Sequence, residues 1–135
     1  MVNAREAIAN SHRVIEVFGE RPSFHDAEIL SIRLDRRGPS LEAVIYVHSI
    51  GPLNADTGYF ELLHKSIVTM KFDRIILHEV GDFNHQNVIF GLHIEHVTAG
   101  SRKFDVRAEP CYGGDFHLEC DAISVVDVKP WVHGD

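Results

Sequence analysis

The chain has 135 residues, of which 44% are hydrophobic and 24% are charged, as in an ordinary globular protein. This composition excludes a disordered or fibrous chain, and the length fits one domain, residues 1–135, around a single core. A formal net charge of −7 disfavours nucleic acid, which is bound by clustered Lys and Arg. It would suit a basic partner, and the alternative, which the charge alone favours, is that it keeps the protein soluble.

The first part of the chain predicts a helix over residues 4–18, ended by the stop signal of Gly19. The side chains at helical spacing are Ala4, Ile8, Ser11, Ile15 and Phe18. This segment lacks the continuous apolar stretch of a signal peptide, and no part of the chain approaches the ~18 apolar residues of a membrane span. We therefore expect a cytoplasmic protein with no membrane partner.

Strand patterns dominate after this segment. From Leu30 to Asp35 apolar and polar residues alternate, which is typical of a half-buried strand. Residues 51–58 read as a loop, and residues 59–65 as either the start of a strand or one helical turn. The predicted strands are 27–35, 41–49, 66–72, 73–78 (separate or a continuation), 88–97, 103–109 and 116–126, the last with a bend.

The connections between these strands are mostly too short for crossover helices, which favours antiparallel pairing. The loops at 36–40 and 99–101 carry the glycine and proline chemistry of hairpin turns. The predicted fold class is α+β, a mainly antiparallel curled sheet with one N-terminal helix packed on it.

His25 and Asp26 stand at the entrance of the first strand. They could supply a metal ligand, a general base with its carboxylate, or an interface contact. The alternative is structural: a backbone hydrogen bond fixes the histidine, and Asp26 stabilises the preceding turn. Adjacent side chains of an extended segment point to opposite faces, so sequence adjacency alone does not pair the two groups.

The segment Asp82–Asn87 places five hydrogen-bonding side chains around one aromatic residue. Such side chains can hold their own backbone in a turn, and they can equally offer contacts to a partner. Turn formation is the better interpretation for Asn84 and Asn87, whereas His85 and Gln86 are better candidates for exposure.

Alternation within two later strands predicts a third group of polar side chains. It places Phe90, Leu92 and Ile94 on one face, and it places Phe116, Leu118 and Cys120 inward. The opposite faces then carry His93, Glu95, His117, Glu119 and Asp121. If the two strands were neighbours, the histidines His93 and His117 and the glutamates could bind zinc, and a solvated polar face is the alternative.

Searches for catalytic motifs are negative. The chain has no phosphate-binding glycine loop, no His-Glu-x-x-His, no Cys-x-x-Cys and no Gly-x-Ser-x-Gly. A tight hairpin at Gly113-Gly114 would leave Cys111 and Cys120 too far apart for a disulfide, so we expect free thiols. His117 falls on the strand face opposite Cys120, which argues against a cysteine nucleophile.

The run Pro22–Arg36, with its Phe-His-Asp-Ala-Glu-Ile core, and the segment Asp82–Asn87 resemble the immunity protein 50 family of bacterial polymorphic toxin systems. Cys120–Ile123 is similar to that family's closing strand, and the resemblance extends over about residues 17–126. It implies a cytosolic protein that binds and neutralises a secreted toxin, with no catalytic residues and no cofactor.

We therefore expect a protein that occludes a cognate, basic toxin. Two alternatives remain: a small metal-dependent hydrolase using the histidines and carboxylates of the sheet, and a homodimer that pairs through an exposed strand edge. The residues predicted to bind the partner are His25, Asp26, Asp82, Asn84, His85, Gln86, Asn87, Glu95, Glu119 and Asp121.

Overall fold

The computed structural model describes residues 8–10, 12–13, 16, 24–97 and 101–131. They form one antiparallel sheet with the strand order β4-β7-β6-β5-β1-β2-β3-β8. The strands are β1 (Glu28–Asp35), β2 (Ser40–Leu53), β3 (Phe60–Asp73), β4 (Ile76–Gly81), β5 (Val88–His96), β6 (Phe104–Tyr112), β7 (Asp115–Cys120) and β8 (Ala122–Pro130). Every predicted strand is present. The predicted strand 73–78 is interrupted between the end of β3 and the start of β4, and the predicted strand 116–126 is divided between β7 and β8.

The predicted α+β class is wrong, because the described residues form eight strands, and only His12, Arg13 and Glu16 among them have a helical backbone. Residues 4–7, 11, 14–15 and 17–18 of the expected helix lie outside the described residues. Asn10 has a φ of 62°, a left-handed conformation that no continuous right-handed helix accommodates. Ala9 instead forms a parallel bridge with Ser124, so its backbone hydrogen bonds go to β8.

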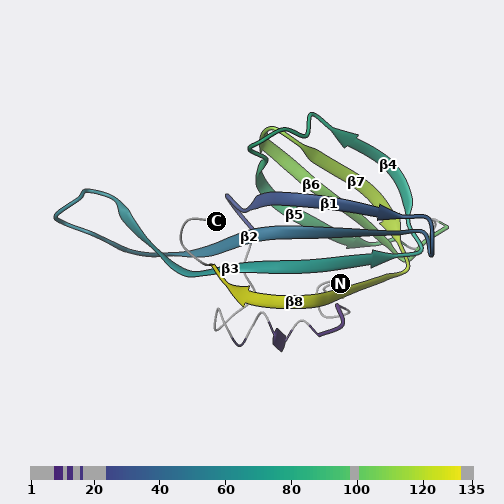
Figure 1. Ribbon diagram of the computed structural model, residues 1–135, viewed down its shortest axis with the longest axis horizontal. Helices are drawn as coiled ribbons and strands as arrows, with labels where there is room; N and C mark the ends of the chain where they lie inside the picture. Colours follow the sequence, from purple (N-terminus) through teal and green to yellow (C-terminus); the bar gives the residue numbers. More distant parts are fainter. Residues whose placement is uncertain (1–7, 11, 14–15, 17–23, 98–100, 132–135) are drawn as a thin grey trace.

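The sheet folds over itself into two layers (Figure 1). The front layer holds β1, β2, β3 and β8, and the back layer holds β5, β6, β7 and β4. Among the described strands, the two layers pair directly only at the start of β1, where Glu28 pairs with Val88. The chain also crosses between them at two neighbouring corners, from β3 to β4 and from β7 to β8, and the N–H of Asp121 donates to the carbonyl of Asp73 (3.0 Å).

The core fills the space between the layers. On β7 the predicted alternation is confirmed, since Phe116, Leu118 and Cys120 are fully buried. The ring of Phe116 contacts that of Phe72 on β3, with 5.9 Å between the centroids, and so joins back layer to front. Apolar side chains at every second position of facing strands therefore produce a single core.

Register shifts overturn the alternation predicted for two other strands. Phe90 was expected to share a buried face with Leu92, but it is 50% exposed, whereas Ile89 and Leu92 are buried. The pairing of β5 with β6 shifts between Ile89 and Gly91, and a bulge reverses the face that the following side chains occupy. A similar shift in β1 leaves Leu30 exposed at 37%.

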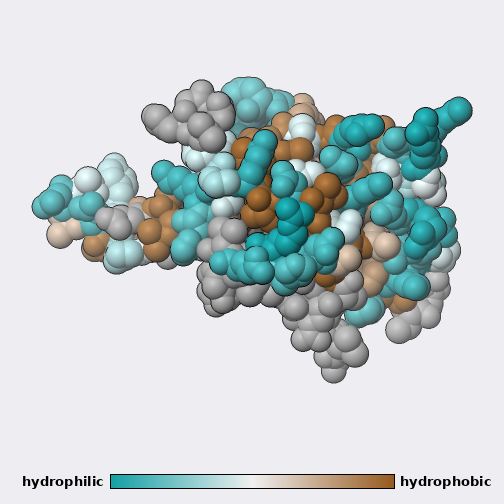
Figure 2. Space-filling view, turned by 60° about the horizontal axis from the view of Figure 1, so that its bottom comes forward, coloured by the Kyte–Doolittle hydropathy of each residue, from teal (hydrophilic) through white to brown (hydrophobic). Residues whose placement is uncertain are grey.

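Strands β2 and β3 extend beyond the body as a two-stranded arm, residues 49–63, at the left of Figure 1. The uncertain segment 59–65 is therefore largely strand, from Phe60 onward. The arm exposes a group of large apolar side chains, and Figure 2 shows hydrophobic atoms along it. They are Leu53, Tyr59, Phe60, Leu62 and Leu63. A two-stranded ribbon has no second layer in which to bury them.

The two edge strands of the sheet, β8 and β4, differ in how they are covered. Along β8, the N–H of Ala9 donates to the carbonyl of Ile123 (2.9 Å), and Ala9 accepts the N–H of Val125 (2.9 Å). No described residue forms such a bridge on the outer edge of β4. Among the described residues, there is also no helix that could cross a membrane.

Candidate functional site

The two motifs of the sequence meet at the junction of β1 and β5. The N–H of Asp26 donates to the carbonyl of Ile89 (2.9 Å), and the N–H of Ile29 donates to that of Asn87 (2.9 Å). We call the segments Phe24–Ala27 and Asp82–Asn87 together the motif junction. Pairing between these strands thus brings together residues that lie about sixty positions apart in the chain.

His25 is fixed by the backbone at the strand entrance. Its Nδ1 lies 2.9 Å from the carbonyl oxygen of Phe90, so the proton is on Nδ1 and the ring donates it. The ring also contacts the ring of Phe90, with 5.9 Å between centroids, and Nε2 lies 3.6 Å from the Asp26 carboxylate. Both side chains remain about half exposed, so a partner protein can still contact them although His25 is fixed by its hydrogen bond to the backbone.

Asn87 is the central residue of the motif junction. It is 2% exposed, and its side-chain amide makes four hydrogen bonds. Oδ1 accepts the N–H of Asn84 (2.9 Å) and of Gly114 (2.7 Å). Nδ2 donates to the carbonyls of Asn84 (2.7 Å) and Ile29 (3.4 Å). One side chain therefore ties its own loop to β1 and to the β6–β7 turn.

The β6–β7 turn is packed closely against this amide. A Cβ on Gly114 would lie 2.8 Å from Oδ1 of Asn87 and 2.8 Å from Cα of Phe83. Gly113 has a φ of 78°, and a Cβ there would lie 2.2 Å from the carbonyl oxygen of Gln86. Both glycines are required by close approach of the loop.

The other motif side chains lie at the surface. Asp82, Asn84, His85 and Gln86 are exposed. Asn84 also stabilises the turn, since its Oδ1 accepts the N–H of Gln86 (2.9 Å). The junction thus combines one buried amide with a rim of polar side chains that a partner can reach.

Sequence reasoning did not select three exposed aromatic residues, one within this junction and two beside it, as candidate contacts. Phe83 is 44% exposed, Phe90 50% and Tyr112 56%. Tyr112 pairs in register with Val88 at the start of β5. Phe90 was hidden from prediction because the bulge in β5 cannot be read from alternation. Exposed aromatic side chains beside polar ones are typical of protein interfaces.

Three histidines of the back layer pair with carboxylates on neighbouring strands. His78 lies 2.7 Å from Glu119, His117 lies 2.7 Å from Asp105, and His93 lies 2.8 Å from Glu109. These pairs form a polar outer face on the sheet.

The strands of the two candidate zinc ligands, His93 and His117, are not neighbours, which was the condition for a zinc patch. His93 and His117 lie on β5 and β7, and both pair in register with Arg107 of the intervening β6. The cationic residue stands between the two imidazoles, and the described residues contain no group of three or more side chains suited to a metal ion.

The remaining predicted carboxylates lie in different surroundings. Glu95 is exposed on β5, whereas the side chain of Glu119 is only 18% exposed. Asp121 lies at the β7–β8 corner, where it accepts the Nε–H of Arg74 (3.2 Å) and the N–H of Lys103 (3.2 Å). Desolvation opposes ionisation of Asp121, but these hydrogen bonds outweigh it and lower the pKa of its carboxyl.

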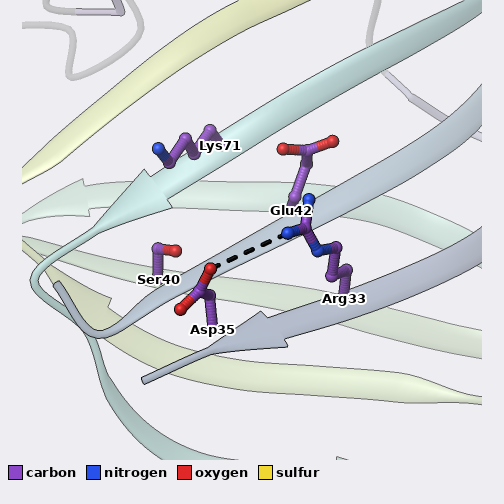
Figure 3. A pocket seen from close by; sticks show the side chains of 5 residues that line it. All are labelled: Arg33, Asp35, Ser40, Glu42 and Lys71. Carbon is purple, nitrogen blue, oxygen red and sulfur yellow. Dashed lines mark ion pairs between the residues drawn. The ribbon is translucent and has the colours of Figure 1, made fainter. Parts of the chain in front are cut away.

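A shallow depression of about 140 Å³ on the front layer is shown in Figure 3. Arg33, Glu42 and Lys71 form one cross-strand row, so a negative charge stands between two positive ones. The next row on the same face holds Asp35 and Ser40, and the guanidinium of Arg33 lies 3.8 Å from the carboxylate of Asp35. The charges compensate one another within the depression, which is typical of a solvated sheet face and not of a site for a charged ligand.

The two cysteines are free and differ in their surroundings. Cys111 is exposed, whereas burial raises the pKa of the Cys120 thiol to about 12, with a further rise from the Asp121 carboxylate. Because the thiolate is the reactive form, we expect a thiol-specific chromogenic disulfide to modify one equivalent quickly in the native protein. The second equivalent should react only on unfolding, and Cys111→Ser should abolish the fast phase; two fast equivalents would contradict the burial of Cys120.

Comparison with known proteins gives one result. The model of the family described as Immunity protein 50 matches residues 10–131. Searches of curated proteins and of solved structures give no match.

Proposed function

The chain belongs to the immunity protein 50 family, and we propose that it binds a cognate protein toxin and neutralises it by occlusion. The family is one of immunity proteins and is not enzymatic. The family match over residues 10–131 is the observation that carries this proposal. A metal-dependent hydrolase has no support, because the histidines pair with carboxylates on either side of Arg107.

We propose that the toxin contacts the exposed rim of the motif junction. The supporting observation is the combination of exposed aromatic rings with polar side chains, since buried aromatic anchors surrounded by a polar rim dominate many interfaces. The proposed contacts are His25, Asp26, Asp82, Asn84, His85 and Gln86, together with Phe83, Phe90 and Tyr112. Asn87 would act indirectly, because its buried amide holds the loop that carries them.

The negative net charge of the chain supports the proposal that the toxin is basic. The net charge of −7 would attract a cationic partner and speed its approach at low salt. Glu95 would add to this field from β5, and Glu119 and Asp121 would contribute charge more than direct contact, because both are engaged within the sheet. A cytoplasmic location in a bacterial producer is part of the same proposal.

The test has two steps. The tagged protein is used to retain partners from its native cells at low and moderate salt, and a retained protein with a secretion domain and a toxin domain is then expressed in a heterologous host. We expect that toxin to stop growth, and co-expression of this chain to restore it. Failure of co-expression to restore growth, although the two proteins bind, would contradict neutralisation.

The contacts are tested by Phe90→Ala and Tyr112→Ala in the same growth assay, with binding measured by calorimetry. Each truncated aromatic anchor should weaken binding by roughly thirtyfold, equivalent to about 2 kcal/mol. Tyr59→Ala, at a 77% exposed site on the arm, is the matched control and should change affinity less than about threefold. Equal effects of all three changes on affinity would show that the toxin does not bind specifically at the motif junction.

A further inference from the structure

A groove of about 480 Å³ opens between β1 and β4. Its walls are mostly apolar, with Ile32 and Leu34 from β1, Leu77 and Val80 from β4, and Phe83 from the motif junction. Leu34 is 54% exposed, Leu77 37% and Val80 40%. The groove is therefore continuous with the proposed toxin-binding surface through Phe83.

The groove is the place where the core of the protein reaches the surface. Leu34 pairs in register with Leu41, and Ile32 pairs with Ala43, and both partners are fully buried. Ile32 and Leu34 thus point from β1 into the space between the layers. At this seam the two layers do not meet, so apolar side chains that are covered elsewhere remain in contact with water.

The groove runs along the free edge of β4. Val80 pairs with the buried Phe116 and so faces inward, whereas Glu79 pairs with His117 on the outer face. Both residues line the groove, and side chains from opposite faces of a strand can share one groove only along its edge. Within the described chain, β4 pairs with β7 alone, which leaves backbone donors and acceptors along this edge unpaired.

This edge carries only part of the usual protection. Proteins blunt free edges with charged residues, proline, bulges, very short strands or a covering segment, and here Ala9 covers the opposite edge at β8. β4 reads Ile-Leu-His-Glu-Val-Gly over six residues, and it has one carboxylate, Glu79, and one register shift against β7, between Leu77 and Glu79, but no lysine, no proline and no covering segment among the described residues. An open strand edge beside an apolar groove is the geometry that binds an extended peptide by strand addition.

Charge at the groove indicates the chemistry of its occupant. Glu79 lines it and Asp82 lies at the end of β4, and neither forms an ion pair with another described residue. His78 is already paired with Glu119. The carboxylates would favour lysine or arginine in a bound segment, whereas Ile32 and Leu34 would favour apolar side chains.

We propose that the groove binds an extended segment of the toxin, about six residues long, that adds to β4 as a new edge strand. The segment alternates apolar residues, packed on Ile32 and Leu34, with basic residues near Glu79 and Asp82. This inference rests on the proposed function, since it names the part of the toxin that is recognised. The added strand would fill the groove between β1 and β4 and cover the apolar side chains that are exposed there.

The test uses the toxin identified by retention and growth arrest, with hydrogen exchange measured on the immunity protein alone and in the complex. We expect amides of residues 76–81 to become protected on binding. Leu34→Asp and Val80→Asp should each weaken binding at least about tenfold. Leu62→Asp, at a 44% exposed apolar site on the arm, is the matched control and should leave affinity within about twofold. Thermal melts establish that each variant is folded.

The outcomes separate the two proposals. If the wild-type chain does not restore growth, the proposed function fails. If it restores growth but β4 stays unprotected, or the groove variants bind as well as Leu62→Asp, the groove inference is overturned while the function stands. Sedimentation of the free protein as a dimer with β4 protected would also overturn it, because a second copy would then occupy the edge.

Discussion

Asn87→Ala should lower the free energy of unfolding by about 4 kcal/mol, one of the two largest effects that we expect from a single substitution. The change removes four hydrogen bonds of a buried amide and leaves backbone groups of Asn84, Gly114 and Ile29 without partners. Each buried backbone group left unsatisfied costs about 1–3 kcal/mol, and entry of water into the vacated space offsets part of the total. Urea denaturation followed by circular dichroism measures the change.

Asn84→Ala is the matched control for this substitution. Asn84 has the same side chain in the same loop, but it is exposed, and its Nδ2 donates only to the carbonyl of Asp82 (3.0 Å) while Oδ1 accepts from Gln86. We expect a loss of about 1 kcal/mol, because water replaces these bonds. Equal losses for the two variants would show that the buried amide does not tie the loop to β1 and to the β6–β7 turn.

Phe116→Ala should be similarly severe, with a loss of about 4 kcal/mol from removal of a fully buried ring in the core. The ring contacts Phe72 across the two layers, so its removal opens a cavity at the point where the layers are joined. For a domain of this size, the loss corresponds to a decrease in the melting temperature of roughly 15 °C. Scanning calorimetry measures it directly.

Phe90→Ala supplies the comparison for Phe116→Ala. Both changes delete the same ring, but Phe90 is 50% exposed on the outer face of β5. Its loss should cost less than about 1 kcal/mol in stability, although we expect it to weaken toxin binding. A large loss of stability from Phe90→Ala would indicate that this ring belongs to the core and would remove the argument for an exposed aromatic anchor.

Much of the fold could be predicted from period-two alternation. In β7 the buried residues Phe116, Leu118 and Cys120 occupy the predicted positions, because its pairing with β6 has no register shift and the shift in its pairing with β4 lies on the β4 side. The prediction of a shared buried face for Phe90 and Leu92 was wrong, since a bulge changes the face without altering the composition of the strand. The helix expected over residues 4–18 was wrong for a different reason: helical spacing says nothing about the left-handed backbone of Asn10.

The candidate site was only partly visible in the sequence. The motifs at His25 and at Asp82–Asn87 could be singled out by composition and by family resemblance. Their contact depends on the pairing of Glu28 with Val88, which no local pattern encodes. The groove is less visible still, because it forms where Leu34 and Val80 lie on different layers of the sheet. Leu34 reads as an ordinary apolar position of its strand, and Val80 lies beyond the predicted strand 73–78.

The interleaving of the two layers has a consequence for how the protein reaches its native state. The front layer takes β1, β2 and β3 from the first part of the chain and β8 from the last, while the back layer is built from the segment between. The pairing of Ser66 with Pro130 spans 64 positions, so a large loop must close before β8 adds any stability. Such non-local topology folds slowly, over about milliseconds to seconds. On the ribosome, the front layer stays incomplete until residues 122–130 have emerged, and the proposed neutralisation of a toxin would begin only after that point.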